Sequence, residues 1–87
     1  MKQAVATLNV IARAPFEVYY EGPALAVSAT NRIGEFDVLP GHADFFSVLL
    51  PGEVIIDVKE GADPISFQIT NGIITVRDNE VMLFANM

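Results

Sequence analysis

Apolar and polar side chains alternate with a period of two along much of this chain. In the segment 65–70, isoleucine and phenylalanine alternate with serine, glutamine and threonine. The segment 53–59 repeats the pattern with Ile55 as its one exception. Because successive side chains of a strand point to opposite faces, this pattern predicts half-buried β-strands that keep one face in water.

Three segments depart from the alternation and carry their own predictions. The segment 81–84 is apolar on both faces, which predicts a strand buried between two layers. The pairs Tyr19-Tyr20 and Phe45-Phe46 place two aromatic side chains side by side. One member of each pair should therefore face outward, and outward aromatic side chains on a small domain indicate a surface that binds a protein partner.

Turn-forming residues recur about every ten residues, which is the spacing of an all-β sandwich or barrel. Asp78-Asn79 is expected to lie in a four-residue hairpin loop. Asn71-Gly72 is either a hairpin turn or a corner at which the chain changes sheets. The turn signals lie at residues 21–23, 31–34, 40–41, 51–52, 61–64, 71–72 and 78–79.

The N-terminal segment 4–14 has two interpretations. Its apolar stretch after Lys2 loosely imitates a signal peptide, but Thr7, Asn9 and Arg13 interrupt that stretch. The segment also carries several β-branched side chains, which favour a strand over a helix. We therefore expect a strand there.

Length and charge exclude several classes of function. The 87 residues form one small domain, residues 1–87, with 5 basic and 11 acidic side chains and a net charge of −6. Such a chain is repelled by nucleic-acid phosphates and by anionic lipid surfaces. No apolar stretch approaches the roughly 20 residues of a membrane-spanning helix, so we expect no nucleic-acid partner and no direct membrane insertion.

Candidate chemistry is sparse. The chain has no cysteine, which excludes disulfides, zinc–thiolate sites, iron–sulfur clusters and cysteine nucleophiles. His42 is the only histidine, and with Asp44 or Asp37 it would offer a two-ligand metal site or an acid–base pair. The alternative is a turn or interface histidine that follows Pro40-Gly41. We favour that alternative, and expect no catalytic residue, no metal and no cofactor.

Glu35 and Asp37 are two carboxylates on either side of Phe36. A surface position gives them neither the burial nor the cleft that glycosidase chemistry needs. They are either solvated acids beside a buried phenylalanine or groups that dock onto a basic partner surface.

The segment 34–43, with the pattern Gly-Glu-Phe-x-x-Leu-Pro-Gly-His, resembles the signature of the epsilon subunit of F-type ATP synthases. The resemblance continues through Pro51-Gly52, through the glycine-centred segment 69–76 and into the segment 81–85. Leu8 to Ile11 and Tyr20-Glu21-Gly22 are also similar, so the match covers nearly the whole chain in order.

The resemblance implies a two-layer antiparallel β-sandwich of about ten short strands. It also implies a non-catalytic rotor subunit of the central stalk, which links the gamma subunit to the ring of c subunits and couples ion-driven rotation to ATP synthesis. The alpha/beta hexamer would be an indirect partner. The expected location is the cytoplasmic face of the inner (plasma) membrane, as a peripheral part of the complex.

The resemblance also implies roles for individual residues. Glu35 matches a position that faces the c ring, and we assign Asp37 and His42 to the same surface. His42 and Ser47 match positions near the gamma subunit. Family members usually continue into a C-terminal pair of helices that regulates ATP hydrolysis. This sequence stops before such a segment, either naturally or because it is trimmed, so regulation and ATP binding are not carried over.

Two other functions compete with a rotor subunit. The first is a stand-alone β-sandwich that serves as a protein-binding module. The second is a small enzyme that uses His42 with Asp37 or Asp44. Neither accounts for the ordered similarity along the chain.

Overall fold

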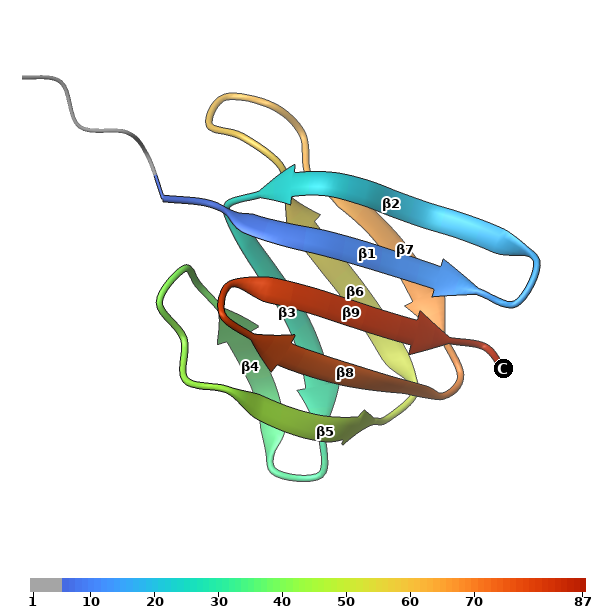
Figure 1. Cartoon of the computed structure of the whole chain (residues 1–87). Coiled ribbons are helices and arrows are strands. Elements are labelled where there is room, and N and C mark those ends of the chain that lie inside the picture. Colours follow the sequence, from blue (N-terminus) through green and yellow to red (C-terminus); the bar gives the residue numbers. More distant parts are fainter. Residues whose placement is uncertain (1–5) are drawn as a thin grey trace, which may run out of the picture.

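The computed structural model describes residues 6–87, which form two facing β-sheets (Figure 1). Sheet A has the strand order β2-β1-β9-β8-β5, and sheet B has the order β4-β3-β6-β7. The predicted all-β, two-layer sandwich is therefore confirmed, with nine strands in the described residues where about ten were expected. The strands are β1 (Leu8–Ala14), β2 (Glu17–Ala24), β3 (Ala26–Asn31), β4 (Gly34–Val38), β5 (Phe45–Leu49), β6 (Gly52–Asp57), β7 (Ile65–Ile69), β8 (Gly72–Arg77) and β9 (Glu80–Ala85).

Pairing in the sandwich is antiparallel with one exception. Within residues 6–87, β1 pairs with β9 in parallel, with Val10 opposite Val81. This pairing places the first strand between its hairpin partner β2 and the last strand. The expected strand in the segment 4–14 is confirmed as β1, although residues 4 and 5 lie outside the described residues.

The core lies between the two sheets and follows the period-two pattern. Val54 and Ile56 of β6 are buried, and so is Ile69 of β7. The alternate positions are exposed polar side chains, Glu53, Asp57, Ser66 and Gln68, except for Ile55, which is apolar and half-buried. Burying a side chain of this size stabilises the fold by about 1.5–3 kcal/mol. The apolar faces predicted for segments 53–59 and 65–70 therefore both lie in one core.

The segment 81–84 is not buried on both faces as its sequence predicts. Val81 and Leu83 are 1 % exposed, but Met82 and Phe84 are 40 % and 38 % exposed. Sheet B covers only the inner face of β9. The apolar side chains on the outer face of β9 are thus available to a partner.

The two aromatic pairs behave differently from each other. Phe46 faces outward and is 63 % exposed, while Phe45 packs on the core, as predicted. Neither tyrosine is fully outward, so the prediction for that pair is wrong. Tyr19 reaches across to sheet B and stacks on Phe67 with ring centroids 4.2 Å apart, and the Tyr20 hydroxyl donates to the Pro23 carbonyl.

Two turns resolve questions that the sequence raises. Asp78 and Asn79 have φ angles of 50° and 62° and form a two-residue hairpin turn, so the predicted four-residue loop is wrong. Positive φ at both central residues is the geometry of a type I′ turn, which suits the twist of the flanking strands. Asn71-Gly72 is a corner that leads from β7 in sheet B to β8 in sheet A.

Gly72 is required at that corner by close packing. A Cβ atom on Gly72 would lie 3.0 Å from the Phe84 carbonyl oxygen and 3.4 Å from the side chains of Ile69 and Leu49. Any larger residue would force the backbone of β9 to shift at this corner, because the tightest contact is with a main-chain oxygen. Within the described part of the chain, no helix is long and apolar enough to span a bilayer.

Candidate functional site

The outer face of sheet A carries an apolar surface that the strand register defines. Phe84 of β9 lies opposite Ile73 of β8, which lies opposite Val48 of β5. The next row joins Ile11 of β1, Met82 of β9 and, beyond Thr75, Phe46 of β5. At a spacing of about 4.8 Å between strands, the first row extends about 10 Å across three strands and the second about 14 Å across four.

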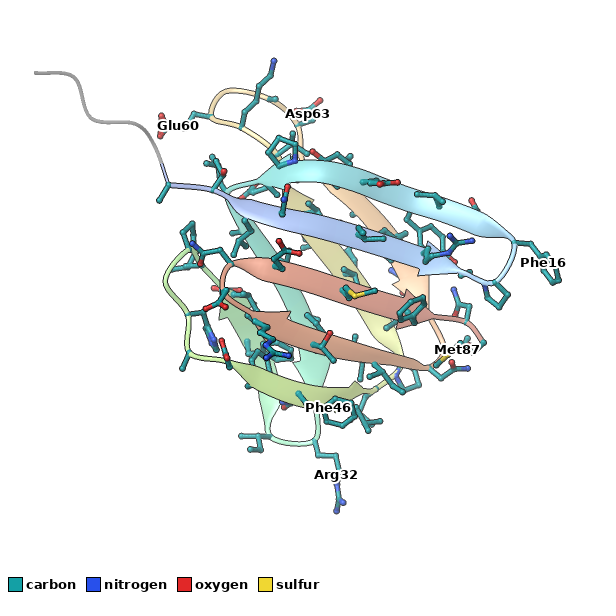
Figure 2. The ribbon with its side chains drawn as sticks, viewed as in Figure 1. Phe16, Arg32, Phe46, Glu60, Asp63 and Met87 are labelled. Atoms are coloured by element: carbon teal, nitrogen blue, oxygen red, sulfur yellow. The ribbon has the colours of Figure 1, made fainter. Side chains whose placement is uncertain are left out.

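Four apolar side chains of these rows, Phe46, Val48, Met82 and Phe84, are exposed, and Ile11 and Ile73 are half-buried. Phe46 and Val48 are 63 % and 57 % exposed, and Leu50 just beyond β5 is 39 % exposed. Figure 2 shows Phe46 projecting from the sandwich at β5. Contiguous exposed apolar side chains on a small domain are typical of a protein-binding surface. We call the six side chains of this surface, Ile11, Phe46, Val48, Ile73, Met82 and Phe84, the apolar face.

One end of the apolar face has a polar border. Glu80 of β9 lies opposite Arg77 of β8, and Asp44 and Asp78 lie beside them. A groove of about 710 Å³ runs over this part of sheet A, with Phe46, Met82 and Thr75 among its lining residues. The groove therefore joins apolar contact area to charged groups.

The outer face of sheet B has the opposite character. None of its four strands contains Lys, Arg or His. Two of its carboxylates, Glu35 and Asp37, lie on the same face of β4, and the Ser28 hydroxyl donates to Asp37 Oδ1 at 2.7 Å. This acidic face is the set of exposed carboxylates Glu35, Asp37, Glu53 and Asp57.

His42 lies in the loop between β4 and β5 and is half-buried. Its ring packs on Phe45, with ring centroids 4.9 Å apart, and Phe45 meets Phe36 edge to face at 5.5 Å. Its Nδ1 atom lies 2.7 Å from the Ala43 carbonyl oxygen. The histidine thus covers the open end of the core between the two sheets.

The structure gives the three residues of the acid–base hypothesis separate partners. His42 contacts Phe45 and the Ala43 carbonyl, Asp44 Oδ1 accepts from the Asp78 backbone N–H at 3.2 Å, and Asp37 accepts from Ser28. A general base needs its proton partner within hydrogen-bond reach. The residues described also contain no group of three His, Cys, Asp or Glu side chains placed to hold a metal ion.

Ser47 occupies an inward position on β5. Its Oγ atom accepts from the Asn31 side-chain amide at 3.1 Å and contacts the Val48 carbonyl at 3.2 Å. The outward positions on the same strand belong to its neighbours Phe46 and Val48. Ser47 therefore ties the edge of sheet A to the end of β3, at the margin of the apolar face.

Sequence reasoning missed the outward role of β9. The segment 81–84 shows no polar side chain that would mark an outer face, so its pattern cannot distinguish one buried face from two. The available signal was indirect. The pair Phe45-Phe46 already predicted one outward aromatic side chain, and β9 lies two strands from β5 in the same sheet.

The site is thus a small β-sandwich whose two outer faces differ, one apolar and one acidic. The sequence matches the family described as "ATP synthase, Delta/Epsilon chain, beta-sandwich domain" over residues 7–87. The chain belongs to this family.

Individual relatives agree with this assignment. The chain is 32 % identical over 82 residues to the ATP synthase epsilon chain of Vesicomyosocius okutanii, covering 94 % of this chain and 58 % of the relative. It is 34 % identical over 68 residues to the epsilon chain of Legionella pneumophila, covering 78 % and 48 %. The chain thus spans about half the length of the curated relatives it matches.

Two solved structures share the fold. A chain in the Euglena gracilis mitochondrial ATP synthase structure titled OSCP/F1/c-ring matches 99 % of this chain and 54 % of its own length, with a TM-score of 0.84 and 23 % identity. A chain in the Tetrahymena thermophila mitochondrial ATP synthase central stalk/c-ring structure matches with a TM-score of 0.74 and 18 % identity. These two likenesses establish the sandwich fold of this chain.

Proposed function

We propose that this chain is a non-catalytic component of the rotor of an F-type ATP synthase. In this role it binds the gamma subunit and rests against the c ring, so that it transmits ion-driven rotation toward the alpha/beta hexamer. It acts at the membrane surface, on the cytoplasmic face of the inner (plasma) membrane, without entering the bilayer. The family match over residues 7–87 is the observation that carries the proposal.

The two faces of the sandwich support two separate contacts. The apolar face of sheet A suits the gamma subunit, because a lasting contact between subunits buries an apolar centre. Ser47 and His42 lie beside this face, on β5 and the loop before it. We therefore keep both as gamma-facing residues at its margin.

The acidic face suits the c ring. Glu35 and Asp37 are exposed, and His42 lies on the loop that follows β4. Carboxylates at an interface guide the orientation and rate of docking more than they raise its affinity. We assign Glu35, Asp37 and His42 to the contact with the polar loops of the c ring.

The fold suits a part that works under load. A sandwich with short turns and a continuous core resists bending because its interior is close-packed. The Gly72 corner and the parallel β1–β9 pair connect early, middle and late parts of the chain. Torque applied to one face is then carried through the core to the other.

Co-expression with the gamma subunit of the same organism tests the proposal. A tagged chain should co-purify with gamma at equal stoichiometry, and this pair should then retain detergent-solubilised c ring on a column. The stand-alone binding module predicts a stable partner that is not gamma. Purification of the chain free of gamma, while gamma is folded and abundant, would overturn the rotor assignment.

A further inference from the structure

The groove at the polar border of the apolar face has a defined construction. Its floor is formed by outward side chains of three neighbouring strands, Phe46 of β5, Thr75 of β8 and Met82 of β9. Phe46 is 63 % exposed and Met82 is 40 % exposed. The groove of about 710 Å³ therefore offers apolar contact that no other part of residues 6–87 covers.

The border of the groove is acidic and is held in place. The border carries three carboxylates, Asp44, Asp78 and Glu80, and one guanidinium, Arg77. The Asp78 backbone N–H donates to Asp44 Oδ1 at 3.2 Å, and the Gly41 N–H donates to Asn79 Oδ1 at 2.7 Å. These two hydrogen bonds fasten the loop before β5 to the β8–β9 turn, so the charges are positioned before any partner arrives.

We propose that the groove selects its partner through an apolar side chain flanked by Lys or Arg. The apolar side chain packs between Phe46 and Met82, and the flanking cations meet Asp44 and Glu80. The inference rests on the proposed function, since the occupant is a segment of the gamma subunit that covers the apolar face. The chemistry of the groove specifies which kind of segment that subunit must present.

The acidic border of the groove distinguishes among the partners that could fill an apolar groove. A second copy of this chain would bring two acidic borders and two net charges of −6 together, and like charges across an interface are unfavourable. An anionic lipid surface meets the same repulsion. A basic protein segment is attracted by the carboxylates of the border and makes apolar contact with the floor. Of the three occupants, it alone is favoured by both parts of the groove.

The test compares two charge-matched double variants for binding to immobilised gamma subunit. Asp44→Asn with Glu80→Gln removes two charges from the groove, and Asn at position 44 keeps the oxygen that accepts from Asp78. Glu53→Gln with Asp57→Asn removes the same charge from the acidic face of sheet B. Net charge is then equal, and only its place differs.

We expect the groove variant to associate about tenfold more slowly than wild type at about 0.02 M salt, with the difference shrinking at about 0.5 M salt. The sheet B variant should keep most of the wild-type association rate. Equal association of the two variants would show that only net charge matters and would overturn the inference. Failure of gamma to bind wild type would overturn the proposed function, and the inference with it.

A second measurement addresses the floor of the groove. Phe46→Ala should dissociate from gamma about 30-fold faster, because an aromatic side chain at the centre of an interface dominates its energy. Phe16→Ala is the matched control, since Phe16 is 101 % exposed at the tip of the β1–β2 hairpin, away from the groove (Figure 2). Similar dissociation of the two variants would overturn the assignment of the groove. A chain that sediments as a dimer dispersed by Phe46→Ala would identify a second copy as the occupant instead.

Discussion

The two sheets of the sandwich differ most in the faces they turn outward. The outer face of sheet A carries exposed apolar side chains on β5 and β9, Phe46, Val48, Met82 and Phe84, whereas the outer face of sheet B carries four carboxylates and no basic side chain within its strands. Their inner faces are alike, since both are built from buried apolar side chains that form one core. Folding therefore needs the inner faces, and under the proposed function the difference between the outer faces corresponds to two different partners.

The same difference appears within single strands. In β9, Val81 and Leu83 point into the core while Met82 and Phe84 point outward, and all four are apolar. In β6 the outward residues Glu53 and Asp57 are charged. The strand β9 is thus apolar on both faces, one of which packs in the core while the other lies in the surface that we propose for the gamma contact.

The largest expected effect tests which side of β9 belongs to the core. Leu83→Ala should lower the free energy of unfolding by about 3 kcal/mol, because it empties a buried site. For a domain of this size that corresponds to a fall in Tm of more than about 10 °C. Met82→Ala should cost less than about 1 kcal/mol, since Met82 is 40 % exposed. Urea unfolding of the two variants measures both values, and equal losses would contradict the assignment of faces.

A charge placed on each outer face in turn directly tests the difference between the outer faces of sheet A and sheet B. Val48→Glu puts a carboxylate in the apolar face, and Gln68→Glu puts one on the outer side of sheet B. Burying an unpaired charge at an interface is costly, so the first variant should bind gamma about 100-fold more weakly, or about 2.7 kcal/mol. The second should stay within about threefold of wild type.

Both positions are exposed, so both variants should retain the wild-type Tm within about 3 °C. Titration calorimetry with purified gamma separates the two outcomes. If Gln68→Glu lost as much affinity as Val48→Glu, the gamma contact would not be confined to sheet A.

A smaller effect is expected on the acidic face. Glu35→Lys reverses one exposed charge and should weaken docking to isolated c ring about tenfold at low salt, with the fold intact. Glu60→Lys makes the same change in the loop between β6 and β7 and serves as the control. A pull-down with detergent-solubilised c ring measures both. Equal retention of Glu35→Lys and wild type would refute the contact assigned to Glu35.

Alternation and turn chemistry predicted most of the fold. One outward member of the Phe45-Phe46 pair and the inward sides of segments 53–59 and 65–70 follow from the period-two pattern, and the strand at the start of the chain follows from its β-branched residues. Each of these is a local property, decided by which face of one strand meets water. The sequence therefore contains enough information to fix them.

The features that sequence reasoning did not predict depend on neighbours distant in the chain. Pattern alone could not show that β9 pairs in parallel with β1, or that its outer face lacks a covering layer. Tyr19 is half-buried because Phe67, 48 residues later, lies beneath its ring (67 − 19 = 48). The type I′ turn at Asp78-Asn79 depends on two residues that adopt positive φ without glycine.

The site residues likewise divide into those that the sequence predicted and those that depend on neighbours distant in the chain. Glu35 and Asp37 were expected to be exposed acids beside Phe36, and the structure places them so. The acidic face as a whole was not foreseen, because Glu53 and Asp57 join it only through the pairing of β6 with β3. The groove likewise forms only because the loop before β5, with Asp44, lies beside the β8–β9 turn and Glu80.

The smallest expected effect concerns Ser47. Its hydroxyl accepts from Asn31 at 3.1 Å, on the inward side of β5, while Phe46 and Val48 occupy the outward side. Ser47→Ala should therefore lower the free energy of unfolding by about 1 kcal/mol or less, the value of one partly exposed hydrogen bond. Affinity for gamma should change by less than about threefold, because the serine would act through the position of β5.

Asn31→Ala removes the same hydrogen bond from its other end and is the matched variant. If the serine works through that bond, both variants shift the unfolding curve and the gamma affinity together. A loss of gamma binding in Ser47→Ala alone, at an unchanged Tm, would show that the hydroxyl itself touches gamma. That outcome would extend the gamma contact from the outer face of sheet A around its edge strand β5 toward β3 of sheet B. The boundary between the gamma-binding surface and the acidic face would then no longer coincide with the boundary between the two sheets.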